Sequence, residues 1–192
     1  MATSVYDFDI PSNLTVLLAG LVGRKLINII RFNDVPEQEL IEDYYMNPKD
    51  FFCCSLEPFL FYFEDGLVIG GVSDPGQNTV LMWVEKKENG EHRDWLQEED
   101  EETIPFYAKD YDDWNIYLNQ VVKSVTIIKE TSEISYKVRS RPSERGVLLK
   151  FENGSGFIIS HGLNDNSDDT TLVKPDGIDP AFENNLVYIP VV

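Results

Sequence analysis

The sequence is poor in basic residues, and it contains few cysteines and histidines. Sixteen Lys and Arg stand against 34 Asp and Glu, so the formal net charge of the 192-residue chain is −18. Proteins that bind the phosphates of DNA or RNA use Lys and Arg for this purpose, and anionic membranes attract basic segments in the same way. The charge therefore argues against direct nucleic-acid binding and against docking on a membrane.

Long apolar runs are also missing. The apolar run at residues 14–21 contains Gly20, is followed by Gly23, and falls short of the roughly 18 apolar residues that a spanning helix needs. The N-terminal residues show neither the basic region nor the cleavage pattern of a signal peptide. The two cysteines, Cys53 and Cys54, are adjacent, which favours free thiols in a reducing compartment over a disulfide framework. We therefore expect a cytoplasmic protein that does not insert into a membrane.

Runs of β-branched and aromatic residues bounded by turn residues dominate the chain and predict strands. We expect strands at 24–32, 59–63, 67–69, 79–85, 121–129, 147–151, 157–160 and 186–189, and weaker ones at 134–138 and 172–173. Asp65-Gly66 and Asn153-Gly154 are strong hairpin signals. Capping residues and acidic first turns predict short helices at 14–23, 34–45 and 114–119. The predicted fold class is α+β: strand-rich, with antiparallel meanders and hairpins and a few short helices.

Two short patterns occur twice in the same order. Residues 63–66 (FEDG) match residues 151–154 (FENG) at a spacing of 88, and residues 25–31 resemble residues 123–129 at a spacing of 98. This echo raises the hypothesis of a duplicated unit of helix, strand and hairpin. Coincidence is the alternative, because hairpins and strands often use these residues. We expect a first half at 1–87, an acidic junction or loop at 88–113 and a strand-rich second half at 114–192, packed as one compact unit.

The sequence carries no motif of a catalytic or metal site. His92 and His161 lie in different halves, and Cys53-Cys54 lacks the two-residue gap that lets two thiolates chelate zinc. No nucleophile elbow or phosphate-binding glycine loop is present. Residues 164–169 alternate oxygen ligands but depart from the calcium-loop template at its sixth and twelfth positions. We predict no enzyme activity, no cofactor and no bound metal.

The acidic junction combines high charge with aromatic residues. Residues 88–113 hold eleven acidic and two basic residues, a net charge of −9. Aromatic residues among carboxylates are typical of a surface that binds a basic protein. The predicted partner-binding residues are Glu98, Glu99, Asp100, Glu101, Glu102, Tyr111, Asp112, Asp113 and Trp114. The alternative is a charged loop that its aromatic residues anchor to the core.

A small, acidic, strand-rich chain without an assembled active site resembles a bacterial immunity protein, the inhibitor of a polymorphic or contact-dependent growth inhibition toxin. The resemblance rests on the meander 59–85, its echo 147–163 and the acidic block 98–102. It implies tight one-to-one binding of a cognate toxin domain, often a basic nuclease. Two alternatives stay open. One is a ligand-binding or enzymatic protein with a site near His161, Asp165 and Asp168; the other is an adaptor or homodimer that pairs through an exposed strand edge.

Overall fold

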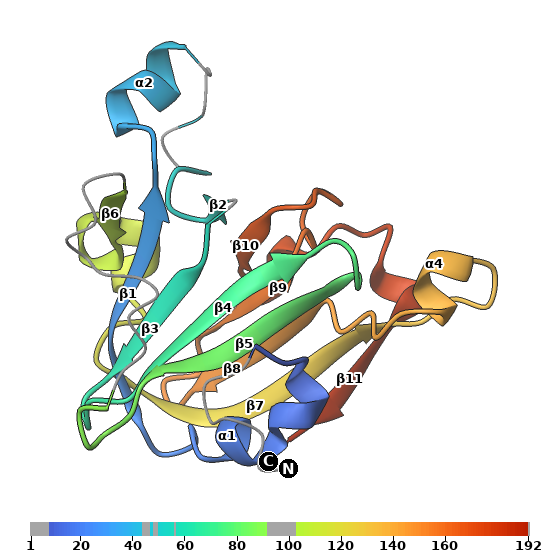
Figure 1. Ribbon diagram of the computed structural model, residues 1–192, viewed down its shortest axis with the longest axis horizontal. Helices are drawn as coiled ribbons and strands as arrows, with labels where there is room; N and C mark the ends of the chain where they lie inside the picture. The colour runs from blue at the N-terminus through green and yellow to red at the C-terminus, as the bar shows by residue number, and fades with distance from the viewer. Residues whose placement is uncertain (1–7, 44–46, 48–49, 56, 92–102, 192) are drawn as a thin grey trace.

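The structure, a computed structural model, describes residues 8–43, 47, 50–55, 57–91 and 103–191. In this part of the chain, eleven strands form an antiparallel sheet in the order β2-β10-β9-β8-β7-β1-β3-β4-β5, with β6 beside β1 and β11 beside β7 (Figure 1). Only short helices accompany the strands. The predicted strand-rich α+β class is confirmed.

The first half of the chain runs from η1 to β6. Its helices are η1 (Pro11–Leu14), α1 (Thr15–Ala19) and α2 (Glu37–Glu42). Its strands are β1 (Lys25–Asn33), β2 (Cys54–Ser55), β3 (Phe59–Phe63), β4 (Val68–Asp74), β5 (Thr79–Lys86) and β6 (Ile104–Tyr107). Gly20 ends α1, and Gly23, at φ 85°, turns the chain into β1. Gly66, at φ 91°, makes the predicted hairpin between β3 and β4, because a residue with a Cβ would be strained there.

The second half runs from η3 to β11. Its helices are η3 (Ala108–Asp110), α3 (Asp112–Asn115), α4 (Tyr136–Arg139), η4 (Pro175–Gly177) and η5 (Glu183–Asn185). Its strands are β7 (Gln120–Glu130), β8 (Gly146–Phe151), β9 (Gly156–His161), β10 (Thr170–Val173) and β11 (Leu186–Pro190). The predicted Asn-Gly hairpin joins β8 to β9, with Gly154 at φ 87°.

Two local predictions were wrong. The weak strand expected at 134–138 is α4, where the Ser135 side chain caps the helix by accepting a hydrogen bond from the Val138 N–H. Ile134 just before it is 95% exposed, so the apolar alternation there did not mark a sheet face. Strand β6 was not predicted. It lies in the acidic junction, and its pairing with β1, distant in the sequence, holds it in place.

The two halves share one pattern of strand pairing. β1 pairs with β3, β3 with β4 and β4 with β5, just as β7 pairs with β8, β8 with β9 and β9 with β10. A β-bulge interrupts both first pairs, between Leu26 and Asn28 and between Val122 and Ser124. Equivalent residues of β1 and β7 are therefore 96 positions apart. The sequence echo placed them 98 positions apart because it aligned Lys25 with Lys123 by residue type, whereas the strand pairing aligns Lys25 with Val121.

A local two-fold axis relates the halves. Lys25 of β1 pairs with Val121 of β7, and Val121 is the residue of the second half that is equivalent to Lys25. In the hairpin strands the offset is 88 positions, so Ser73 of β4 and His161 of β9 are also equivalent, and these two side chains contact each other. The axis thus passes between β1 and β7 and again between β4 and β9. Strands β6 and β11 lie at equivalent places, because β6 pairs with β1 as β11 pairs with β7.

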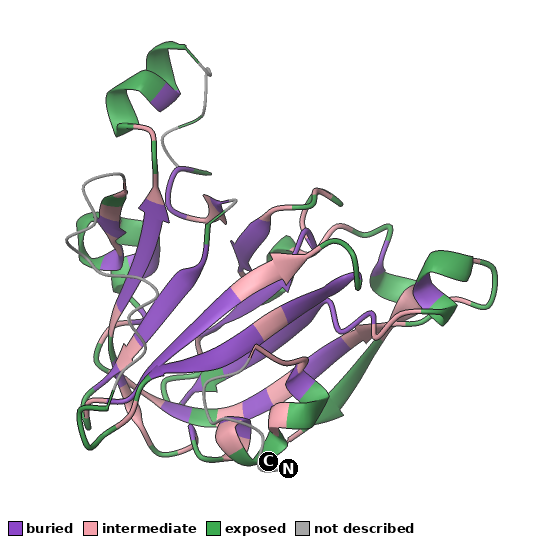
Figure 2. Ribbon diagram, in the orientation of Figure 1, coloured by how far each residue is buried: buried purple, intermediate pink, exposed green. Residues whose placement is uncertain are grey.

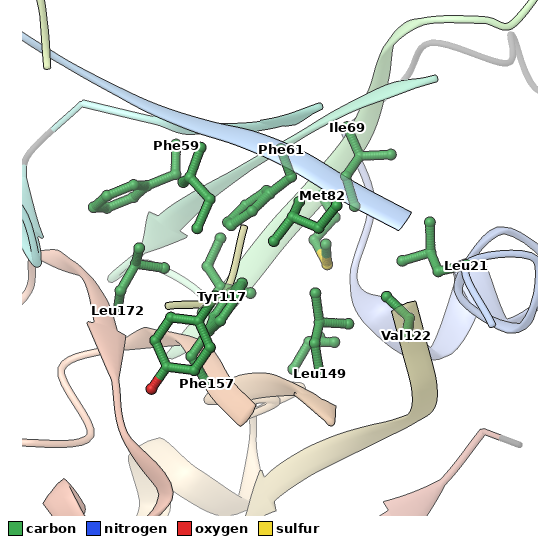
Figure 3. Close-up of a cluster of buried hydrophobic side chains, with 14 of the residues drawn as sticks. Leu21, Phe59, Phe61, Ile69, Met82, Tyr117, Val122, Leu149, Phe157 and Leu172 are labelled. Carbon is green, nitrogen blue, oxygen red and sulfur yellow. The ribbon is translucent and has the colours of Figure 1, made fainter. Parts of the chain in front are cut away.

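The apolar faces of the two halves bury one another. In Figure 3, Phe59, Phe61, Ile69 and Met82 from the first half face Leu149, Phe157 and Leu172 from the second. The rings of Phe61 and Phe157 stack with centroids 5.8 Å apart. Full burial of a Phe side chain contributes about 1.5–3 kcal/mol. Figure 2 shows the buried residues concentrated in the strands, whereas α2 and α4 project as exposed helices from two separate ends.

Buried polar groups join the β4–β5 turn to the segment that precedes β8. Arg145, 3% exposed, forms an ion pair with Glu130 at 3.0 Å and donates to the His161 carbonyl at 2.8 Å. Asn78 donates to Glu130 and to Ser143, at 3.1 Å in both cases. Each of these charges and amides has a partner, so the network fixes the relative placement of the halves.

The cross-strand pair of Gly70 and Trp83 gives a test of the packing. Gly70→Ala should lower the free energy of unfolding by about 1–3 kcal/mol, because the added Cβ would lie 2.1 Å from Cζ2 of the buried indole. Gly177→Ala is the matched control, since its Cβ would meet only Val173 Cγ1, at 3.4 Å. The control should change stability by less than about 0.5 kcal/mol. Urea unfolding measures both variants, and equal effects would contradict this packing.

Candidate functional site

The structure places the predicted partner-binding residues in different environments. Glu98, Glu99, Asp100, Glu101 and Glu102 lie outside the described residues. Trp114 is 4% exposed, and its ring packs against Phe52 and Tyr117 with centroids 5.9 and 5.6 Å apart. Its side chain is therefore part of the core and anchors this segment, as in the alternative interpretation of the junction.

The three neighbouring residues reach the surface. Tyr111 is half-buried, and its ring lies over Phe52 with centroids 5.1 Å apart. Asp112 and Asp113 are exposed in the first turn of α3. Asp113 forms an ion pair with Lys174 at 2.8 Å, between two side chains that are 59% and 40% exposed. An exposed pair of this kind contributes little to stability.

Acidic residues of α2 extend this surface. Burial raises the pKa of Tyr111 to about 12, and the nearby carboxylates of Glu37 and Asp110 act in the same direction. Side chains from α2 and η3 therefore lie close to one tyrosine. We call the exposed acidic residues of these segments the acidic face: Asp34, Glu37, Glu39, Glu42, Asp43, Asp110, Asp112 and Asp113. The sequence prediction missed the α2 part, although residues 34–43 hold five acids and no base.

Arg31 lies behind the acidic face. Its side chain is 2% exposed, and the guanidinium carbon is 5.3 Å from the centroid of the Phe106 ring. Within the described residues, its Nε and Nη1 have no hydrogen-bond partner and no carboxylate forms an ion pair with it. Burial lowers the pKa of Arg31, and the neighbouring Cys54 and Tyr111 partly offset this. Sequence reasoning did not single out this residue, because a lone Arg in a strand gives no signal.

The adjacent cysteines are free thiols, as predicted. Their Sγ atoms are 3.7 Å apart. The hydrogen bond with Cys53 and burial raise the pKa of the Cys54 thiol. Cys54 therefore stays protonated at neutral pH and is a poor nucleophile.

His161 is held by hydrogen bonds at the end of β9. It is 1% exposed, and its Nδ1 is 2.5 Å from Ser73 Oγ, which in turn is 2.7 Å from the Asp168 carbonyl oxygen. A carbonyl only accepts, so the Ser73 hydroxyl donates to it and accepts from the Nδ1–H of a neutral imidazole. A serine nucleophile would need the opposite direction, with its hydroxyl donating to His161. This arrangement links β4 to β9 and does not activate the serine.

The loop that suggested calcium lies next to this histidine. Asp165 and Asp168 are exposed, and burial followed by repulsion from Asp165 raises the pKa of Asp169. In the described ranges, no three His, Cys, Asp or Glu side chains are grouped so that they could hold a metal ion. A cavity of about 460 Å³ lies nearby, and residues including Cys53, Trp114 and Lys174 line it. His161 is not among the residues that line this cavity.

The end of the second half carries the opposite charge. Helix α4 follows β7 as α2 follows β1, and it is rich in bases where α2 is rich in acids. A groove of about 640 Å³ beside α4 is lined by Lys129, Arg139 and Arg141 together with Glu130 and Glu133. The two ends of one scaffold therefore present different charges to the solvent.

Comparisons with known proteins identify no relative: no protein-family model, no curated protein and no solved structure matches this chain. Among the described residues, no helix has the length and apolar character needed to span a membrane.

The environment of His161 predicts a pH dependence of stability. Burial, and then the charge of Arg145, lowers its pKa from 6.5 to about 4. As the pH falls, the unfolded chain binds a proton at this histidine before the folded chain does. The stabilising contribution is complete above pH 6.5 and is lost between pH 6.5 and 4, by about 3 kcal/mol.

His161→Gln should remove this part of the pH dependence and leave the part due to carboxylates. Urea unfolding between pH 4 and 7.5 compares the two proteins. Parallel curves of unfolding free energy against pH would contradict a buried neutral histidine.

Proposed function

We propose that this protein is a non-catalytic inhibitor that binds a basic protein through the acidic face, in the manner of a bacterial immunity protein that neutralises a toxin domain. The observation that carries the proposal is the convergence of exposed acids from two segments at Tyr111. Residues 34–43 and 108–113 contain eight acids and one base, Lys109. Glu37 and Asp110, one from each segment, both lie close enough to the Tyr111 hydroxyl to raise its pKa.

The acidic face also carries apolar contact area. Ile41 on α2 is 41% exposed, and Ile116 just after α3 is 51% exposed. Charged residues around apolar ones are typical of protein interfaces, in which charges speed the encounter and apolar and aromatic residues supply most of the affinity. Tyr111 remains neutral at physiological pH because its pKa is about 12. Its hydroxyl can then donate to a partner without adding charge.

The non-catalytic part of the proposal draws support from His161 and Cys54. The histidine is buried and donates to Ser73, and the raised pKa of Cys54 keeps that thiol protonated. The His161 side chain is therefore held in a structural hydrogen bond, and the Cys54 thiol is unreactive. The alternative of an enzymatic site near His161 draws no support from this geometry.

Charge substitutions test the acidic face once affinity capture from the native cell has supplied the partner. The triple variant Glu37→Gln, Asp110→Asn, Asp112→Asn should lower the association rate constant by about tenfold at low salt, because steering depends on these charges. The wild-type rate should fall steeply as salt increases. Stopped-flow or biosensor kinetics measure both effects.

A second triple variant, Glu133→Gln, Glu152→Gln, Glu183→Gln, removes the same charge from exposed positions outside the acidic face. Its association rate should change by less than about twofold. Equal losses in the two variants would contradict the acidic face. If the bound protein is a toxin, co-expression of the wild type should restore growth of cells that make it, and failure to do so would contradict the inhibitor function.

The edge of β11 favours a second candidate, a homodimer. The Thr131 N–H donates to the Asn185 carbonyl and the Val191 N–H donates to the Val125 carbonyl. Because backbone groups alternate along a strand, Leu186 and Tyr188 direct theirs away from β7. Val187, Tyr188 and Ile189 are 45%, 49% and 42% exposed. An antiparallel β11 of a second copy would pair with these groups about an axis at Tyr188.

If the protein forms this homodimer, its average molar mass in solution should increase with protein concentration. Size-exclusion chromatography with light scattering should show a dimer that Tyr188→Pro converts to a monomer, since proline removes the outward N–H and leaves the bonds to β7 intact. Circular dichroism should show an unchanged fold. A wild-type protein that stays monomeric at high concentration would contradict this candidate.

A further inference from the structure

The internal symmetry shows that the fold does not require a charge at position 31. The equivalent of Arg31 is Ile127, 96 positions later. Arg31 pairs with Phe59 of β3 and Phe106 of β6. Ile127, 2% exposed, has the equivalent neighbours Val147 of β8 and Ile189 of β11. The second half fills this place with an aliphatic side chain and pairs its strands in the same way.

A buried guanidinium at such a place is unfavourable for folding. Removing an ion from water costs several kcal/mol unless a counter-charge and hydrogen bonds compensate. The described residues supply Arg31 with a ring contact to Phe106, but with no ion pair and with no hydrogen-bond acceptor for Nε or Nη1. The missing compensation points to a group that binds at Arg31.

Two of the groups that act on Arg31 are hydrogen-bond donors. The Tyr111 hydroxyl lies close enough for each group to affect the pKa of the other, and the Cys54 thiol is a further neighbour. Tyrosine and cysteine donate while they are protonated, and Arg donates in every state. A planar guanidinium matches the two oxygens of a carboxylate or phosphate. The arrangement therefore suits an oxyanion.

The surrounding carboxylates limit the size of that anion. Asp169 acts on Arg31, and Glu37 and Asp110 act on Tyr111, yet none of the three pairs with the guanidinium. These three carboxylates repel a polyanion more strongly than they repel a small ion that reaches the guanidinium directly. Nucleic acids are therefore unsuited to this site.

We propose that Arg31 is the centre of a binding site for a small oxyanion, a phosphate or a carboxylate, which the guanidinium and the Tyr111 hydroxyl hold together. This proposal does not rest on the inhibitor function, because it starts from the buried guanidinium of Arg31 and not from the charges of the acidic face.

Thermal unfolding of the wild-type protein gives the first test. Inorganic phosphate and, separately, acetate are titrated against sodium chloride at matched ionic strength. A saturable rise of about 2–4 °C in midpoint over chloride would support the site. A rise with phosphate alone assigns a tetrahedral ligand, and a rise with acetate assigns a planar carboxylate. No rise beyond chloride with either anion would overturn the proposal.

Substitutions locate the effect. Arg31→Met keeps the length of the side chain without its charge, so it should raise the midpoint in chloride by about 2–4 °C and abolish the response to the anion. Tyr111→Phe keeps the ring against Phe52 and removes the hydroxyl, so it should at least halve the response. Arg139→Met, at an exposed arginine, is the control and should keep the full response.

Two outcomes with the variants would overturn the proposal. One is an Arg31→Met protein that is less stable than the wild type in chloride, because the guanidinium would then be compensated within the chain. The other is a response to the anion that persists in full in both Arg31→Met and Tyr111→Phe, because the anion would then bind elsewhere.

Discussion

The structure depends on the mutual burial of two apolar sheet faces. In the folded chain, one face of the strands of each half is covered by the other half, as the stacked rings of Phe61 and Phe157 illustrate. The hydrogen bonds from Asn78 to Glu130 and Ser143 and the contact between Ser73 and His161 then fix how the faces meet. Because both contacts join segments from different halves, apolar burial supplies the stability and the polar network supplies the specific alignment.

A comparison of the two halves distinguishes the features that the fold requires, which recur in both, from the features that occur in one half alone. The bulges, the glycine turns and the strand order recur in both halves and so belong to the architecture. Two differences between the halves concern charge: α2 is acidic and α4 is basic, and Arg31 stands where the second half has Ile127. Since the scaffold tolerates either residue, these differences are the places where function is expected.

The hairpins, the strand-rich class and the free thiols could be predicted because each rests on residues close together in the sequence, such as Asp65-Gly66. The features that were missed rest on contacts between distant segments. β6 forms because β1 offers it an edge, and Trp114 is buried because Phe52 and Phe157 lie above it; aromatic residues among carboxylates look the same whether they face a partner or the core. The acidic part of α2 could have been found from its five acids without a base.

The pairing of Lys25 with Val121 has a consequence for how the chain folds. Each hairpin can form early, since its strands are separated by a few residues, but β1 and β7 meet only after a loop of nearly a hundred residues has closed. A topology with so many distant contacts folds more slowly than one built from local contacts, and neither half gains its full burial until that closure. The halves are thus expected to form and melt in a single cooperative transition, despite their resemblance to two independent repeats.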